Sequence, residues 1–163
     1  MATHALRFGA GPAIAAGVIA GLVFAVFEMI AAAVMMGPQA MFMPLRMIGG
    51  IVLGAAALDP GYPIVTAASA GVLVHMVLSV VFALVFAFIA PSSASMAVLV
   101  LSGIVFGTGL WLVNFYLIAP IMGWNWFPEQ ADPAIQFLAH AFFFGAPIGW
   151  YLGTTRTVRV SAA

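Results

Sequence analysis

The sequence predicts an all-α, polytopic membrane protein with four transmembrane helices. Only 5% of its 163 residues are charged, 66% are hydrophobic, and four apolar segments are each long enough to cross a bilayer. A soluble domain carries about 25% charged residues, so this composition cannot cover a water-exposed surface. Backbone groups in lipid must be satisfied within their own element, which favours helices, and no alternating pattern indicates a barrel. We expect one membrane domain over residues 1–163.

The composition also excludes several classes of function. The chain contains no Cys and no Lys, and its formal net charge is zero. Disulfides and thiolate metal sites are therefore excluded, and no basic patch for nucleic acid is present. The sequence has no phosphate-binding loop, no dinucleotide-binding glycine turn and no credible nucleophile–base pair. We therefore do not predict an enzyme.

Four segments reach the length of about 20 residues that spans a bilayer as a helix. They are Gly11–Met36, Ile64–Ala90, Met96–Ile118 and Pro133–Thr154. Proline or glycine lies at their ends, as expected of helix boundaries. The connection after the first segment contains a shorter apolar run, Met47–Leu58. This run is too short to span, which favours a re-entrant or interfacial helix.

The arginines predict the orientation of the chain. Arg7, Arg156 and Arg159 flank the two termini, whereas Arg46 is the only basic residue in a connection on the other side. By the positive-inside rule, both termini face the cytoplasm. Four helices are too few to enclose a large substrate path, so we expect a homo-oligomer or a subunit of a larger membrane complex, with the lipid bilayer as its surroundings.

The first and third segments share a pattern at a constant offset of 86 residues. Gly17, Gly21, Glu28, Met36 and Gly37 align with Gly103, Gly107, Asn114, Met122 and Gly123. Each glycine pair has the spacing that lets helices approach closely. Glu28 follows Gly21 by nearly two helical turns and therefore shares the glycine face, as does Asn114. The pattern is explained either by duplication of a two-helix hairpin or by convergent glycine packing.

Each predicted helix carries one strongly polar residue. These are Glu28, His75, Asn114 and His140, and Gln136 precedes His140 by one turn. At 1.5 Å per residue, all four lie roughly 7–16 Å from the outer ends of their helices, in a common layer. Glu28 is the only formal charge between Arg7 and Arg46. Because a charge in hydrocarbon costs about 3 kcal/mol on insertion scales, something must compensate it.

Three interpretations of this polar layer remain open. In the first, the residues only lock the helix bundle of a structural or accessory subunit: Glu28 bonds to one histidine and Asn114 to the other. In the second, they bind or relay a small cation. Glutamate and histidine are common intramembrane proton carriers, and a set of His75, His140 and Glu28 also suits a metal ion. In the third, His75 and His140 ligate a b-type haem.

Arg46 offers a further way to compensate Glu28. Its long side chain can reach back into the bundle from the following connection and pair with the carboxylate. The alternatives are an ion pair with Asp59 in the same connection or a contact with lipid phosphate.

Two stretches of the chain resemble a known group of proteins. Phe27-Glu28-Met29-Ile30-Ala31 and the run Met43–Gly49, read as Met-Pro-Leu-Arg-Met-Ile-Gly, are similar to small four-helix bacterial membrane proteins of unknown function. The resemblance covers most of the chain and implies a bacterial inner (plasma) membrane location. Some of those proteins carry an automatic label of sodium:proline symporter. Symporters of that kind have ten or more helices, so no residue here inherits sodium or proline binding.

Overall fold

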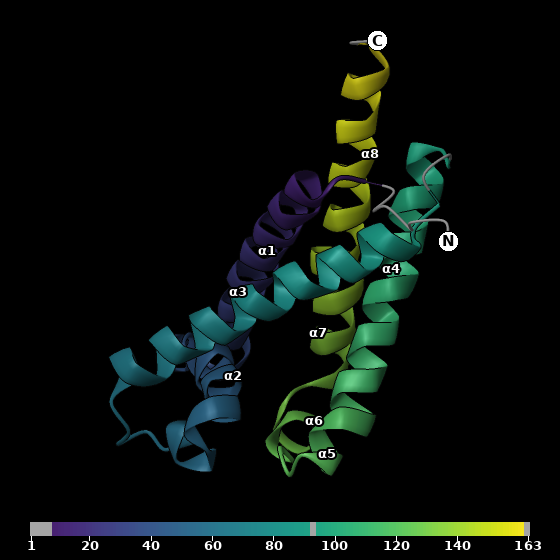
Figure 1. Ribbon diagram of the computed structural model, residues 1–163. Coiled ribbons are helices and arrows are strands. Elements are labelled where there is room, and N and C mark those ends of the chain that lie inside the picture. The colour runs from purple at the N-terminus through teal and green to yellow at the C-terminus, as the bar shows by residue number, and fades with distance from the viewer. Residues whose placement is uncertain (1–7, 92–93, 162–163) are drawn as a thin grey trace.

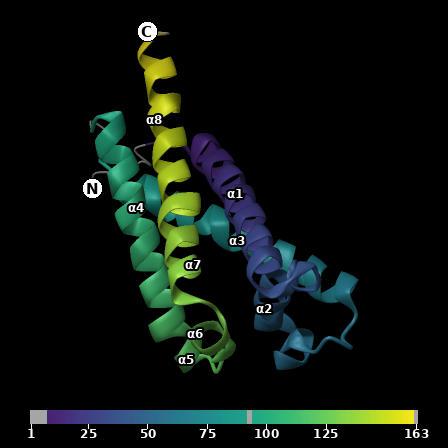
Figure 2. The same cartoon turned by 180° about the vertical axis from the view of Figure 1, so that it is seen from behind.

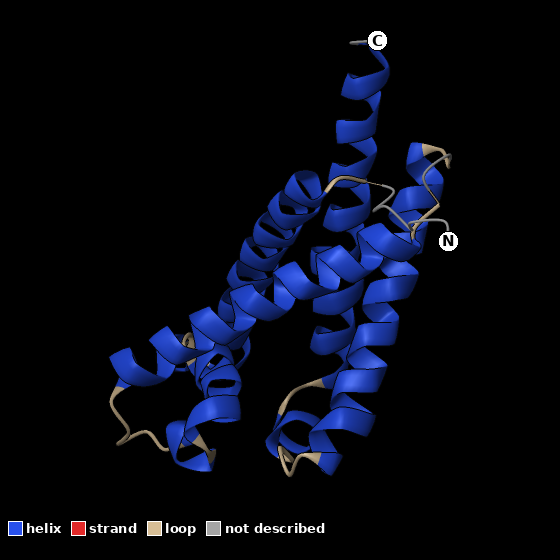
Figure 3. Ribbon diagram, in the orientation of Figure 1, coloured by secondary structure: helices blue, strands red, loops and turns tan. Residues whose placement is uncertain are grey.

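The computed structural model describes residues 8–91 and 94–161, and every regular element in these ranges is helical (Figure 3). Four helices are long and apolar enough to cross a membrane, which indicates a multi-pass membrane protein. Two are the uninterrupted helices α1 (Ala10–Met36) and α3 (Ile64–Ile89). The third span, Met96–Ile121, contains α4 (Met96–Val113), a π-helical segment (Asn114–Ile118) and α5 (Ala119–Ile121). The fourth span, Pro133–Thr155, contains α7 (Pro133–Leu138), a π-helical segment (Ala139–Gly145) and the start of α8 (Ala146–Ser161).

The predicted boundaries agree closely with these elements. The helix starts and ends differ by one residue or none in the first two spans. The third span runs three residues beyond the expected end at Ile118, and α8 continues past Thr154 to Ser161. The short apolar run Met47–Leu58 forms α2 (Met43–Leu53), which begins earlier than predicted, and a 3-10 turn (Ala55–Leu58).

Helix α1 shows how the sequence separates its two faces. Aliphatic side chains at every fourth position from Ile14 to Val34 are exposed, on a stripe that winds slowly around the helix. In the first half of the helix, Ala13, Ala16 and Ala20 lie away from this stripe and are fully buried. Large apolar groups thus project outward, where lipid replaces water, and small residues allow close helix contact.

Helix α1 packs against α3 and the fourth span, and the fourth span packs against α4. Helix α3 is steeply tilted and crosses α1 and the fourth span, so that its C-terminal end lies near α4 (Figures 1 and 2). There the ring of Phe86 contacts that of Phe106 on α4, with centroids 5.3 Å apart. Helix α2 packs along α3. The first turn of α1 and the last turn of α8 lie at one end of the bundle (Figure 1). Helices α2, α5 and α6 (Trp126–Gln130) lie at the other end, which we call the α2 end.

Glycines set the closest helix contacts. A Cβ added at Gly17 would lie 2.7 Å from the Cα of Val80 on α3, and one at Gly21 would lie 2.7 Å from the Oγ of Ser79. In the third span, Gly103 and Gly107 meet the main chain of the fourth span at Gly145 and His140. The two glycine pairs recognised in the sequence are therefore contacts inside the bundle.

The third and fourth spans each contain a π-helical segment that ends two residues before a proline. Ala119 N–H donates to the carbonyl of Asn114, five residues back, and Pro120 follows. Ala146 N–H donates in the same way to Ala141, and Pro147 follows. A proline ring clashes with the carbonyl four residues earlier, so a widened turn before it relieves the clash. Asn114 and His140 both lie in these widened turns.

Candidate functional site

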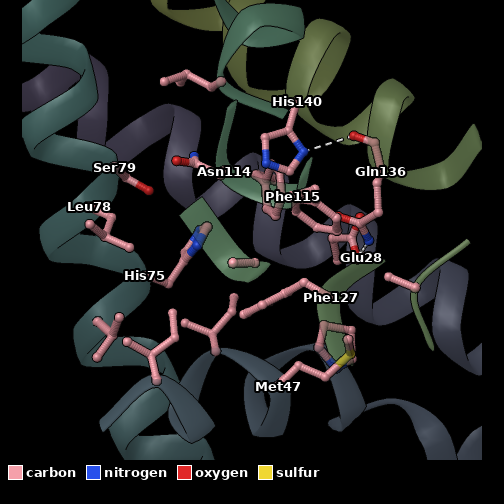
Figure 4. Close-up of a pocket in the computed structure, with 18 of the residues that line it drawn as sticks. Glu28, Met47, His75, Leu78, Ser79, Asn114, Phe115, Phe127, Gln136 and His140 are labelled. Carbon is pink, nitrogen blue, oxygen red and sulfur yellow. Dashed lines mark hydrogen bonds between the residues drawn. The ribbon is translucent and has the colours of Figure 1, made fainter. Parts of the chain in front are cut away.

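The structure contains a cavity of about 350 Å³, and all four spans line it. Most of its wall is apolar, with aromatic side chains from several elements. The polar lining residues are Glu28, His75, Ser79, Asn114, Gln136 and His140. Figure 4 shows these side chains arriving from different helices around one space. All of these residues except Ser79 were singled out in the sequence. The structure therefore brings those five residues to a single cavity.

Glu28 lies on the buried face of α1, one turn after Phe24, and only 6% of it is exposed. Its Oε2 accepts a hydrogen bond of 2.8 Å from the Nε2 of Gln136 on α7. Its Oε1 is fully buried and has no hydrogen-bond partner among the described residues. The predicted histidine partner is wrong, because the structure places the amide of Gln136 against the carboxyl group.

The two histidines are held by main-chain carbonyls. The Nε2 of His75 lies 2.8 Å from the carbonyl oxygen of Gly21, and the Nδ1 of His140 lies 2.8 Å from that of Gln136. Since a carbonyl only accepts, each of these ring nitrogens must carry the proton that it donates. In a neutral ring, the second nitrogen is then an unprotonated acceptor. Figure 4 shows the second nitrogen of His140 on the side that faces Asn114.

The ring of Phe24 lies close to both histidines. Its centroid is 5.1 Å from that of His75 and 4.9 Å from that of His140, which it meets edge-on. Bis-histidine haem ligation needs an open gap between the two rings for the iron and the macrocycle. Because the centroid of Phe24 lies about 5 Å from both imidazole rings, its ring occupies space that a macrocycle between them would need, so these residues do not fit a haem.

A metal ion is not favoured by the donor set either. In the part of the chain that the structure describes, no three His, Asp or Glu side chains form a group that could hold a metal. One oxygen of Glu28 is bonded to an amide and the other is enclosed by protein atoms. The combination of His75, His140 and Glu28 predicted from the sequence therefore does not converge as ligands.

Arg46 is engaged away from Glu28. Its guanidinium donates to three carbonyls in the connection after α2, those of Ala57, Asp59 and Tyr62, at 2.9–3.1 Å. Charge-assisted bonds of this kind order a loop. The pairing of Arg46 with Glu28 is therefore not formed. Arg46 binds Asp59 through the main-chain carbonyl of that residue, whereas the sequence suggested an ion pair with the Asp59 carboxylate.

A second, smaller cavity of about 230 Å³ adjoins the first at the α2 end. Its wall includes four methionines and the carboxylate of Asp132. Glu28 and Gln136 line both cavities, so their hydrogen bond lies in the partition between them. Asp132 itself accepts from two backbone N–H groups in the first turn of α7.

Sequence reasoning missed the aromatic part of the site. Phe24, Phe115, Phe127 and Phe144 line the large cavity together with Trp124. Two signals pointed to them: Phe24 precedes Glu28 by one helical turn, and Phe115 follows Asn114 directly. A phenylalanine in an apolar run is otherwise indistinguishable from a lipid-facing one, so the other phenylalanines carried no such signal.

Comparisons with protein-family models, curated proteins and solved structures give no match to this chain. The function must therefore be argued from the site itself.

Proposed function

We propose that this chain is a small integral membrane protein whose intramembrane site binds and relays a small cation, and that the cation is a proton carried by Glu28. The observation that carries the proposal is the buried Oε1 of Glu28, which lacks a partner. An ionised carboxylate in apolar surroundings is stable only if it is paired and hydrogen-bonded. Glu28 accepts one hydrogen bond from the amide of Gln136 and has no cationic partner among the described residues.

The space around Glu28 favours a proton over a larger cation. Its unpartnered oxygen is enclosed by protein atoms, so an ion with a coordination shell has no room there. A proton neutralises the carboxylate and occupies almost no volume. Glutamate within a transmembrane segment is a common element of proton relays.

Polar groups continue from Glu28 into the cavity. Gln136 donates from its side chain to Glu28 and accepts at its main-chain carbonyl from His140. His75 and Asn114 line the same cavity. Asp132 lines the adjoining cavity at the α2 end. His75 and His140 in the large cavity and Asp132 in the adjoining one can each bind a proton, so proton-binding groups lie on both sides of Glu28.

The test is infrared spectroscopy of the protein in lipid bilayers across a range of pH. We expect a carbonyl stretch from a protonated carboxylic acid that vanishes as the pH is raised, and that is absent at every pH in Glu28→Gln. The matched control is Glu129→Gln, since Glu129 is an exposed glutamate on α6. The band should persist in this control. A spectrum with no band that depends on Glu28 would refute the proposal.

A structural role for Glu28 is the second candidate. The observation that favours it is the Glu28–Gln136 bond, which joins α1 to the fourth span. Glu28→Gln keeps the size of the side chain and an oxygen that can accept from Gln136. If Glu28 is only a lock, this variant should therefore keep assembly and stability, and no titrating band should be found in the wild type.

Several finer features of the fold belong to the same proposal. A repeated two-helix hairpin is supported by the two glycine pairs, each of which packs against the next long helix.

We further propose that α2 is re-entrant, that the chain lies in a bacterial inner membrane as an oligomer or complex subunit, and that both termini are cytoplasmic. Arg156 and Arg159 lie in the last turns of α8, at the opposite end from Arg46, as the orientation requires. Arg7 lies outside the described residues.

A further inference from the structure

The chemistry of the large cavity restricts what it can hold. Each histidine uses its protonated nitrogen on a carbonyl, which leaves an acceptor nitrogen on His75 and another on His140. Glu28, whose Oε2 accepts from Gln136, lines the same wall and adds negative charge to it when it is ionised. A ligand that satisfies these groups must therefore bring hydrogen-bond donors.

The charges around the site favour a positive ligand. Glu28 lines both cavities and Asp132 lines the smaller one, whereas no Lys or Arg of the described residues lines either. The nearest arginine in the sequence, Arg46, is held by the carbonyls of its own loop. In a low-dielectric site this arrangement attracts a cation and repels an anion.

The remainder of the wall favours an apolar body on that cation. The aromatic residues that line the cavity are Phe24, Phe82, Phe115, Phe127, Phe144 and Trp124. Phe24 and Phe115 already contact His140 edge-on, with centroid distances of 4.9 and 5.5 Å. Aromatic faces attract ammonium groups as well as apolar rings. A volume of about 350 Å³ lies within the range of small-molecule sites.

We propose that the large cavity binds a lipophilic amine in its protonated form, with the ammonium against the acceptors of His140 and His75 and the apolar body among the aromatic rings. This inference rests on the proposed proton site. When the amine binds, Glu28 gives up its proton and its carboxylate balances the ammonium charge. One proton leaves the protein for each cation bound, and the adjoining cavity with Asp132 provides its route toward the α2 end.

The experiment uses isothermal titration of the purified full-length chain in detergent with three probes of one shape. Naphthylmethylamine is the cation, naphthylmethanol the neutral analogue and naphthylacetate the anion. We expect the amine to bind at least about tenfold more tightly than either analogue, a preference of about 1.4 kcal/mol. A pH indicator in weakly buffered solution should report about one proton released per amine bound.

Two variants identify the groups responsible, and a third is the control. In Glu28→Gln the preference for the amine over the alcohol should fall to about one, and proton release should stop. His140→Phe keeps an aromatic ring beside Phe24 and removes the acceptor, so it should reduce the amine preference about threefold or more. Glu129→Gln should match the wild type. Binding of the alcohol is the internal reference, since a misfolded variant loses it as well.

Equal binding of amine and alcohol to the wild type would overturn this inference, and so would an amine preference that survives in Glu28→Gln. Failure of all three probes to bind, as expected if lipid or detergent fills the cavity permanently, would also overturn it. The infrared test separates the two proposals. A titrating band from Glu28 without an amine preference overturns only the ligand class, whereas the absence of that band overturns the proton site.

Discussion

The contact between α1 and α3 gives a prediction whose size follows from the structure. Replacing Gly21 by Ala would place a Cβ 2.7 Å from the Oγ and 2.8 Å from the Cβ of Ser79. The same change at Gly17 would place a Cβ 2.7 Å from the Cα of Val80 and 2.8 Å from the carbonyl oxygen of Ser79. The first obstacle is a side chain, whereas the second is the main chain of α3.

Ordinary contact begins at 3.4 Å, so each substitution requires a shift of about 0.7 Å. Overpacking of this kind costs about 1–3 kcal/mol. We expect Gly17→Ala to lower the free energy of unfolding by an amount near the upper end of this range, because the two helices must separate. We expect about 1 kcal/mol for Gly21→Ala, since Ser79 can adjust in part. Separation at Gly21 would also lengthen the 2.8 Å bond from His75 to the Gly21 carbonyl.

The assay is unfolding in mixed micelles with increasing dodecyl sulfate, followed by tryptophan fluorescence. In a Ser79→Gly background, Gly21→Ala should no longer reduce the free energy of unfolding, because the obstructing atoms are gone. Gly17→Ala should stay destabilising in that background. Gly109→Ala is the control, since a Cβ there has no neighbour within 4 Å. An equal cost of Gly21→Ala in both backgrounds would refute this account of the contact.

Three further variants test the α2 end. Asp132→Ala removes the cap of α7 and should lower the free energy of unfolding by about 1 kcal/mol, whereas Asp132→Asn should retain most of it; the same unfolding assay distinguishes them. Arg46→Met removes three charge-assisted bonds, so residues 57–62 should exchange amide hydrogens faster, and unchanged exchange would contradict the role assigned to the guanidinium. Trp126→Phe loses the 3.1 Å bond to the carbonyl of Met47 and should cost about 1 kcal/mol, while Trp150→Phe at an exposed position should cost little.

The sequence alone determined the four spans because the bilayer imposes strong requirements. A membrane demands about 20 apolar residues and internally satisfied backbone groups, and both requirements are visible in composition. Glycine and proline then placed the ends of α1 and α3 within one residue. The third span was predicted too short, because Pro120 marks a helix end in a sequence but is accommodated in the structure by the widened turn before it.

The helical repeat also placed Glu28 on the glycine face of α1, since residues seven and eleven positions apart share a side of any helix. That face is buried against α3 and the fourth span. Helical periodicity alone decides which residues of α1 share a face, so the position of Glu28 toward the bundle interior follows from the sequence.

Only the tertiary structure decided which groups meet across that face. Gln136 reaches Glu28, Arg46 binds its own loop, and Phe24 lies close to the rings of both His75 and His140. Each outcome depends on how far one helix is rotated and tilted against the next, and on turns widened before prolines. Periodicity carries no information on those variables, since lipid-facing and core-facing positions are equally apolar in this chain. The sequence therefore determined that Glu28 must be compensated inside the bundle, and the packing of the helices decided that one of its oxygens has no partner among the residues that the structure describes.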